Sequence, residues 1–275
     1  MRPAVIALVV AAGTVVTLTA FELKPHTLAS WERYIGLHDA LLAENRASDD
    51  IPFLWIDQQP TADRAAFYAR LNRGEVVVER FELREEGEKV DVDDGKIHHW
   101  YGAVFIPGAT IDEVLAWVQD YEDYPVRFTP LIDSAEVLSQ EDARWTVRMR
   151  NRMKKVITIV MDVDYIIDYE RLSPTRLETM NVATNIFQVH DAGEPDERRE
   201  PGDEAGGYLW RFRMVCRFDQ RDEGTFEECE NLSLTRSVPI LLRWLVNPFV
   251  SSVPRETIEF NMGAVRDGVG KTRGG

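Results

Sequence analysis

The fold is decided by residues 102–138, which read GAVFIPGATIDEVLAWVQDYEDYPVRFTPLIDSAEVL. The segment begins as a β-strand, which Pro107 and Gly108 end. Thr110 follows at an N-cap position, and Glu113 lies three residues later, which is the capping-box pattern of a helix start. A return rich in tyrosine and proline and a second strand complete the segment. This order of elements predicts a sheet that grips a helix around a cavity.

The composition is typical of a folded protein and argues against a nucleic-acid partner. Of the 275 residues, 44% are hydrophobic and 29% are charged, and this length suits one large core or a domain with an extension. Lysine and arginine total 32 against 47 aspartate and glutamate, which gives a net charge of −15. Affinity for nucleic-acid backbones and for anionic lipid headgroups comes mainly from cationic side chains. Solubility is the simpler explanation of the acidic balance.

The start of the chain predicts export from the cytoplasm. Arg2 precedes an uncharged run over residues 4–21, and small residues stand at Thr19 and Ala20. A positive charge, an apolar stretch and small residues follow one another in this order in signal peptides. The run is also near the lower length limit of a membrane span, so an uncleaved anchor with membrane association through residues 4–21 is the alternative. Both alternatives predict a protein that is periplasmic, extracellular or anchored facing outside the cytoplasm.

Four parts of the chain are expected. They are a signal peptide or anchor at residues 1–20, a helical extension at 21–73, the main domain at 74–268 and a disordered tail at 269–275. The extension has helical spacing over residues 28–47 and again over 61–72.

The second half of the main domain should be mostly strands, and it should end in helices. From Trp145 the pattern has period two, with Met149 on the same apolar face and Arg148, Arg150 and Arg152 on the other. Such an arginine stripe is either an anion site or, more commonly, a solvated sheet face. Further segments are expected to be a strand at 176–190, an exposed charged loop at 191–207, a short apolar helix at 239–247 and a terminal helix that buries Ile258, Met262 and Val265.

A β-hairpin is expected around a four-residue loop at residues 221–224, which has glycine in the left-handed position. This loop pairs Cys216 with Cys229, and it places Arg217 opposite Glu228 as a favourable cross-strand charge pair. Facing cysteines can form a disulfide in an oxidising compartment. Two buried free thiols are the alternative.

The same register sorts the hairpin side chains onto two faces. One face carries aromatic, sulfur-containing and small polar side chains, namely Trp210, Phe212, Met214, Cys216, Phe218, Glu227, Asn231, Ser233 and Thr235. The opposite face, which includes Arg217, Glu228 and Glu230, is expected to meet solvent. Because unpaired buried polar groups are costly, Asn231 and Glu227 indicate either a ligand cavity with polar anchors or a wet rim.

Residues outside the hairpin carry a resemblance to a known superfamily. They are Ile106, Pro107, Val114, Trp117, Asp120, Tyr124, Pro125, Pro130, Ser252, Val253 and Pro254. On these residues and the order of elements, residues 75–268 resemble the START-like (SRPBCC, helix-grip) superfamily, especially its polyketide-cyclase-like and coenzyme-Q-binding branch. The resemblance implies an α+β helix-grip fold, in which a curved antiparallel sheet wraps around a long C-terminal helix. It also implies a pocket for lipids, quinones, steroids or aromatic polyketides, while the N-terminal helical extension departs from the family.

Non-catalytic binding of a hydrophobic small molecule or lipid outside the cytoplasm is the leading expectation. The expected ligand-binding residues are Trp145, Met149, Trp210, Phe212 and Met214 as apolar wall, with Asn231 and Ser233 as polar groups. His98 and His99 are adjacent on a strand and must point to opposite faces, so no metal site is expected, and no cofactor motif is present.

Two alternatives stay open. A cyclase- or hydrolase-like enzyme would act in the same cavity, with His99, Tyr101 or Glu227 as proton-transfer groups. A structural or interaction module would instead have a completely filled core.

Overall fold

The computed structural model describes residues 23–274 except 49, 155–157, 205–206 and 238–252. The expected leader at residues 1–20 and the expected apolar helix at 239–247 lie outside this part. None of the described helices has both the length and the hydrophobicity that crossing a membrane requires.

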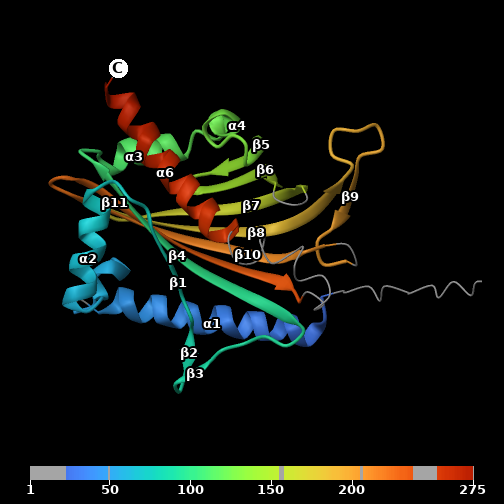
Figure 1. Cartoon of the computed structure of the whole chain (residues 1–275), viewed down its shortest axis with the longest axis horizontal. Coiled ribbons are helices and arrows are strands. Elements are labelled where there is room, and N and C mark those ends of the chain that lie inside the picture. The colour runs from blue at the N-terminus through green and yellow to red at the C-terminus, as the bar shows by residue number, and fades with distance from the viewer. Residues whose placement is uncertain (1–22, 49, 155–157, 205–206, 238–252, 275) are drawn as a thin grey trace, which may run out of the picture.

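One antiparallel sheet of nine strands forms the body of the molecule (Figure 1). In spatial order its strands are β1 (Val77–Arg80), β4 (Gly95–Pro107), β11 (Gly224–Arg236), β10 (Leu209–Arg221), β8 (Arg176–His190), β7 (Thr158–Ser173), β6 (Arg144–Lys154) and β5 (Ile132–Glu141), and β9 (Arg198–Pro201) pairs with β8. A separate small hairpin consists of β2 (Arg84–Glu85) and β3 (Glu88–Lys89).

Helices cover both faces of the sheet (Figure 1). The long C-terminal helix α6 (Val253–Gly274) crosses one face, which we call the inner face. Helix α1 (Pro25–Ala47) lies on the opposite, outer face, together with the 3₁₀ turn η1 (Trp55–Gln58) and α2 (Thr61–Asn72). The segments α3 (Ile111–Val118), η2 (Tyr121–Asp123) and α4 (Tyr124–Arg127) connect β4 to β5. The α+β arrangement of a curved antiparallel sheet on a C-terminal helix, with helices before it, is confirmed.

Helix α3 starts at the expected capping box. Thr110 Oγ1 accepts a hydrogen bond from the Glu113 backbone N–H at 3.3 Å, and the Glu113 carboxylate accepts from the Thr110 backbone N–H at 2.8 Å. These two bonds satisfy donors that a helix start otherwise leaves unpaired. The helix buries Ile111, Val114 and Trp117, and it thereby closes one end of the inner face.

Helix α6 packs directly on the backbone of β4 at Gly102. A Cβ atom at this position would overlap Ile258 and would lie 2.7 Å from the Met262 sulfur. Ile258, Met262 and Val265 are all buried, as expected from the sequence. The absence of a side chain at Gly102 therefore sets the distance between the helix and the sheet.

The hairpin register is confirmed. Gln220 pairs with Thr225, and Arg217 pairs with Glu228. Cys216 faces Cys229 with their Cα atoms 4.1 Å apart, and the two sulfurs form a disulfide.

Two expectations about the end of the domain were wrong. The loop expected over 191–207 contains the short strand β9, because Arg199 and Pro201 pair with Val189 and Phe187 of β8. The tail expected to be disordered from residue 269 is helical to the end of α6, and Val269 is buried.

We predict that Gly102→Ala lowers the free energy of unfolding by about 1–3 kcal/mol, because the added methyl group overpacks the contact with α6. The matched control is Gly36→Ala in α1, where a Cβ meets nothing within 4 Å. Alanine is a better helix former than glycine, so the control should be neutral or more stable. Urea unfolding of both variants measures the difference, and equal stability of the two variants would contradict the close packing.

Candidate functional site

The outer face of the hairpin is buried, which corrects the expectation that it meets solvent. Arg213, Arg217, Asp219, Glu228 and Glu230 are each less than 9% exposed. They are covered because α1 and η1 pack on this side of the sheet. The N-terminal extension is therefore part of the main body of the protein.

Glu230 is the centre of a buried hydrogen-bond network on this outer face. Its Oε2 accepts from His38 Nε2 of α1 at 2.6 Å and from His99 Nε2 of β4 at 3.3 Å. Tyr34 lies 2.9 Å from the other nitrogen of His99, and Arg217 Nη1 lies 3.7 Å from Glu230 Oε1. Burial alone would raise the pKa of Glu230, but the imidazole hydrogen bonds outweigh it and hold this pKa well below its usual value.

The neighbouring carboxylate, Glu228, fastens η1 to the sheet. It accepts backbone hydrogen bonds from Trp55 at 2.7 Å and from Ile56 at 3.0 Å. The rings of Tyr101 and Trp55 are in contact, with their centroids 4.2 Å apart and their planes tilted by 44°. Polar and aromatic contacts on the outer face thus hold the N-terminal extension against the sheet.

His99 and Tyr101 therefore do not belong to a pocket under α6. Strand alternation points both of them to the outer face, whereas Glu227 lies on the inner face opposite Val104 of β4. The sheet therefore separates His99 and Tyr101 from Glu227, and the three candidate proton-transfer residues do not share one cavity.

Two described groups of side chains contain metal-ligand types within reach of one another. In the group of His38, His99 and Glu230, the distances of 2.6 and 3.3 Å are those of hydrogen bonds, and the Arg217 cation lies beside the carboxylate. In the group of Cys216, Glu227 and Cys229, both sulfurs are bonded to each other. A metal centre needs several free ligands, and these two arrangements do not fit one.

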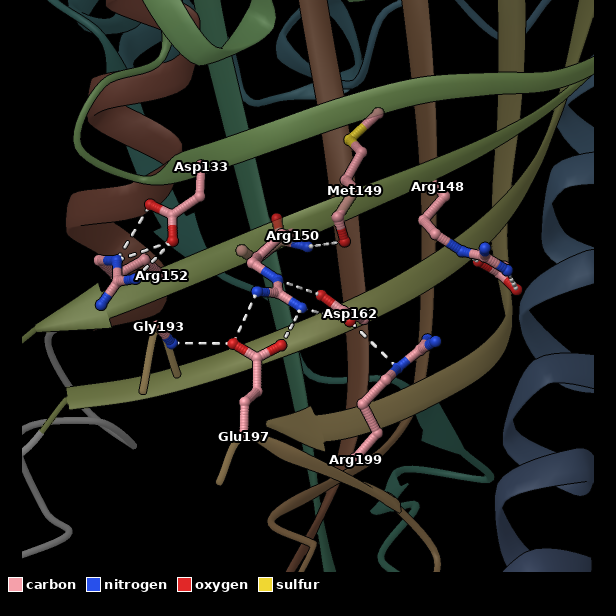
Figure 2. Close-up of polar contacts among 11 residues, drawn as sticks. Asp133, Arg148, Met149, Arg150, Arg152, Asp162, Gly193, Glu197 and Arg199 are labelled. Carbon is pink, nitrogen blue, oxygen red and sulfur yellow. Dashed lines mark hydrogen bonds and ion pairs between the residues drawn. The ribbon is translucent and has the colours of Figure 1, made fainter. Parts of the chain in front are cut away.

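The arginine stripe of β6 is neutralised by acidic side chains, as Figure 2 shows for Arg150 and Arg152. Arg150 lies between Asp162 of β7, with Nε 2.7 Å from Oδ1, and Glu197, with Nη2 2.9 Å from Oε1. Arg152 Nη2 lies 2.6 Å from Asp133 of β5. The stripe is a paired sheet face rather than an anion site.

The strand registers align side chains in rows across the inner face. The row that we call the central row runs over six strands and consists of Trp100 of β4, Asn231 of β11, Met214 of β10, Asn181 of β8, Ile167 of β7 and Trp145 of β6. Ile167 is buried, whereas the other five members are part-exposed. The central row is therefore an apolar strip with two amides that the rest of the protein does not fully cover.

Most of the expected ligand-binding residues lie on this face. Trp145, Met214 and Asn231 belong to the central row, and Phe212 and Ser233 form the neighbouring pair towards one end of the hairpin. Met149 is buried on the inner side of β6.

Trp210 is the exception among the expected residues. A β-bulge between Leu209 and Arg211 turns it to the outer face, where it packs with Trp31 and Leu232.

Several inner-face polar atoms are buried and have no hydrogen-bond partner within the described part of the chain. They are Trp100 Nε1, Asn181 Oδ1 and Glu227 Oε2 in the sheet, and Asn261 Oδ1 in α6. Buried polar groups in folded proteins are normally paired, so these atoms mark places where a ligand or water would bind.

Trp100 and Asn181 were missed from the sequence. Each has the correct parity on its own strand, but their place in the central row follows only from the pairing of β4 with β11 and of β8 with β10. The one sequence signal for Trp100 was that it lies two residues before Gly102 on the same strand, and therefore on the same face of the sheet.

The cavity described on the outer side is too small to be the ligand site. It has a volume of about 10 Å³ and is lined by side chains that include Tyr34, Phe81 and His99. A space of this size holds about one water molecule.

Among known proteins, similarity to this chain was found at the level of solved structures. No family model matches the chain, and no curated protein matches it. A STAR-related lipid transfer protein fragment from Xanthomonas axonopodis is 16% identical with a TM-score of 0.42, covering 69% of this chain and 98% of that one. The Zhui aromatase/cyclase from Streptomyces sp. R1128 is 13% identical with a TM-score of 0.44, covering 64% and 94%. Human STARD10 is 9% identical with a TM-score of 0.40, covering 75% and 80%.

These structures include a fragment of a STAR-related lipid transfer protein and an aromatase/cyclase. At such low identities and TM-scores, the function of this chain has to be inferred from its own side chains.

We predict that Glu230→Gln lowers the free energy of unfolding at neutral pH by roughly 3 kcal/mol, because it breaks a buried charged network. The folded pKa of Glu230 lies below the usual 4.5, so its carboxylate stabilises the fold above that value. The difference between wild type and variant should shrink as the pH falls below 4.5.

Denaturant unfolding over a pH series measures this difference. Glu194→Gln on the exposed loop is the control and should change nothing. A Glu230→Gln variant as stable as wild type at neutral pH would contradict the network.

Proposed function

We propose that this protein binds a hydrophobic small molecule or lipid between the central row and α6, without catalysis and outside the cytoplasm. The observation that carries the proposal is the central row itself, with its part-exposed indole, thioether and amide side chains. Ligand sites in proteins are mostly apolar and contain a few polar groups that orient the ligand. A fully packed core would instead bury such a strip and pair the indole of Trp100 and the amide of Asn181.

The binding energy would come mainly from Trp100, Met214 and Trp145. Burying apolar surface is worth about 25 cal/mol per Å², and aromatic side chains supply the largest areas. Asn181 and Asn231 then fix the orientation, because each offers an amide to a polar atom of the ligand. Phe212 and Ser233 extend the same surface along the hairpin.

A cyclase- or hydrolase-like enzyme is the second candidate, and one observation favours it. Glu227 is buried on the inner face with an unpartnered oxygen, and burial raises its pKa to about 8. A carboxyl group with such a pKa is a suitable proton donor near neutral pH. His99 and Tyr101 lie on the other face, so Glu227 would act without them.

The binding proposal predicts that a larger side chain in the central row weakens binding. Met214→Trp places a larger side chain in the middle of the row, and it should weaken binding of any hydrophobic ligand by at least tenfold. Val182→Trp is the matched control, because Val182 pairs with Arg213 on the outer side and is 38% exposed. This variant should bind as wild type does.

Native mass spectrometry and a binding panel of a fatty acid, a phospholipid, a sterol and a quinone measure the effect. The proposal expects a co-purified molecule or binding of at least one panel member by the wild type. An empty protein that binds no panel member would contradict it.

Export from the cytoplasm is supported by two features of the chain. The order of residues 1–20 is that of a signal peptide, and the structure joins Cys216 to Cys229. Disulfides persist mainly in oxidising compartments. Full-length protein expressed in a bacterium should therefore be found outside the cytoplasm with both thiols blocked to alkylation, and a cytoplasmic protein with two free thiols would contradict export.

A further inference from the structure

Glu227 is the feature of the inner face that apolar binding leaves unexplained. Its side chain belongs to a residue that is 5% exposed, and its Oε2 has no hydrogen-bond partner in the described structure. The Cys229 sulfur lies 3.6 Å from the other oxygen, but a disulfide sulfur carries no hydrogen to donate. A buried carboxyl group without a partner is costly, so the position calls for a ligand group or a water molecule.

Among the described residues, no cation lies where it would stabilise a carboxylate at Glu227. Its cross-strand neighbours are Val104 of β4 and Phe218 of β10. The buried arginines of the described sheet, Arg213 and Arg217, lie on the outer face and pair with acidic residues there.

Tyr124 of α4 is the titratable group that interacts with Glu227 in the described chain. Its hydroxyl donates to the Val118 carbonyl at 2.6 Å, and burial raises the pKa of this tyrosine well above its usual value. Tyr124 therefore stays neutral and supplies no positive charge.

Glu227 is consequently a neutral acid near neutral pH. Burial raises its pKa to about 8, because the charged form loses its hydration and gains no counter-charge. A protonated carboxyl group has an O–H donor. The inner face thus presents a donor at Glu227, another at Trp100 Nε1 and an acceptor at Asn181 Oδ1.

The positions of these groups indicate the shape of the ligand. Glu227 and Asn231 are four residues apart on β11, which corresponds to about 13 Å along a strand. Asn231 pairs with Trp100 and Met214 in the central row. Cys229 lies between Glu227 and Asn231 and pairs with Gly102, the residue on which α6 packs. A ligand that reaches from the central row to Glu227 is therefore elongated, with a polar end and an apolar body, and it has to move α6 away from this row.

We infer that this ligand is an uncharged molecule whose carbonyl or hydroxyl oxygen accepts a hydrogen bond from the Glu227 carboxyl group while its apolar body lies along the central row. The inference rests on the proposed function and adds the chemical class of the ligand. An anionic end group would be buried beside Glu227 without a counter-charge, which is strongly unfavourable. Free fatty acids and phosphate esters are thereby disfavoured as occupants of the interior.

Retinal, retinol and retinoic acid test this selectivity, because they share one apolar body and differ in the end group. Binding to the full chain is measured by quenching of tryptophan fluorescence at neutral pH. We expect retinal and retinol to bind at least tenfold more tightly than retinoic acid.

The pH profile of retinal binding tests the role of Glu227 itself. A raised pKa means that the acid is neutral below about 8 and ionises above it, so the wild-type affinity should fall as the pH rises through this range. Glu227→Gln keeps a neutral donor of similar size, and its affinity should stay constant over the same range. If this variant does not fold, the wild-type profile alone decides.

The outcomes separate the inference from the proposed function. Binding of retinoic acid as tight as that of retinal, or a flat wild-type pH profile, overturns the inference and leaves the proposed function standing. Failure of all three retinoids to bind, together with an empty purified protein, overturns both.

Discussion

The sheet is covered by helices on both faces at β4, β11 and β10, and this constraint determines the environment of every side chain in the hairpin. Successive residues of a strand point to opposite faces. Glu227 therefore faces α6, whereas Glu228 faces η1. Glu230, two residues further on, also lies on the outer face and contacts His38 of α1. Because residue 102 is a glycine, α6 can approach the backbone of β4 closely on the inner face. On the outer face, ion pairs and aromatic contacts join the sheet to the N-terminal extension.

Glu230 and Glu227 are both buried, but on opposite faces of the sheet and in different surroundings. On the outer face Glu230 receives hydrogen bonds from His38 and His99, and its charge is compensated. On the inner face Glu227 Oε2 has no hydrogen-bond partner among the described residues. Two carboxyl groups three residues apart thus have pKa values displaced in opposite directions, because one of them has hydrogen-bond donors beside it and the other is only desolvated.

Much of this arrangement could be predicted from the sequence, because local patterns fix it. The four-residue loop sets the hairpin register, and Thr110 with Glu113 sets the start of α3. The burial of the outer face could not be predicted, since alternating arginine and glutamate also suits a solvated face. The reversal of Trp210 depends on a bulge without a local signal, and Trp100 joins the site only through the pairing of distant strands.

The most direct test of the account is an NMR titration of the full chain with retinal, observing assigned side-chain signals. The indole N–H of Trp100 and the methyl group of Met214 should shift on binding, because both belong to the central row. The indole of Trp210, which packs on the outer face, should stay unchanged. Shifts confined to Trp210, or no shift at Trp100 and Met214 at saturating retinal, would contradict a binding site on the inner face.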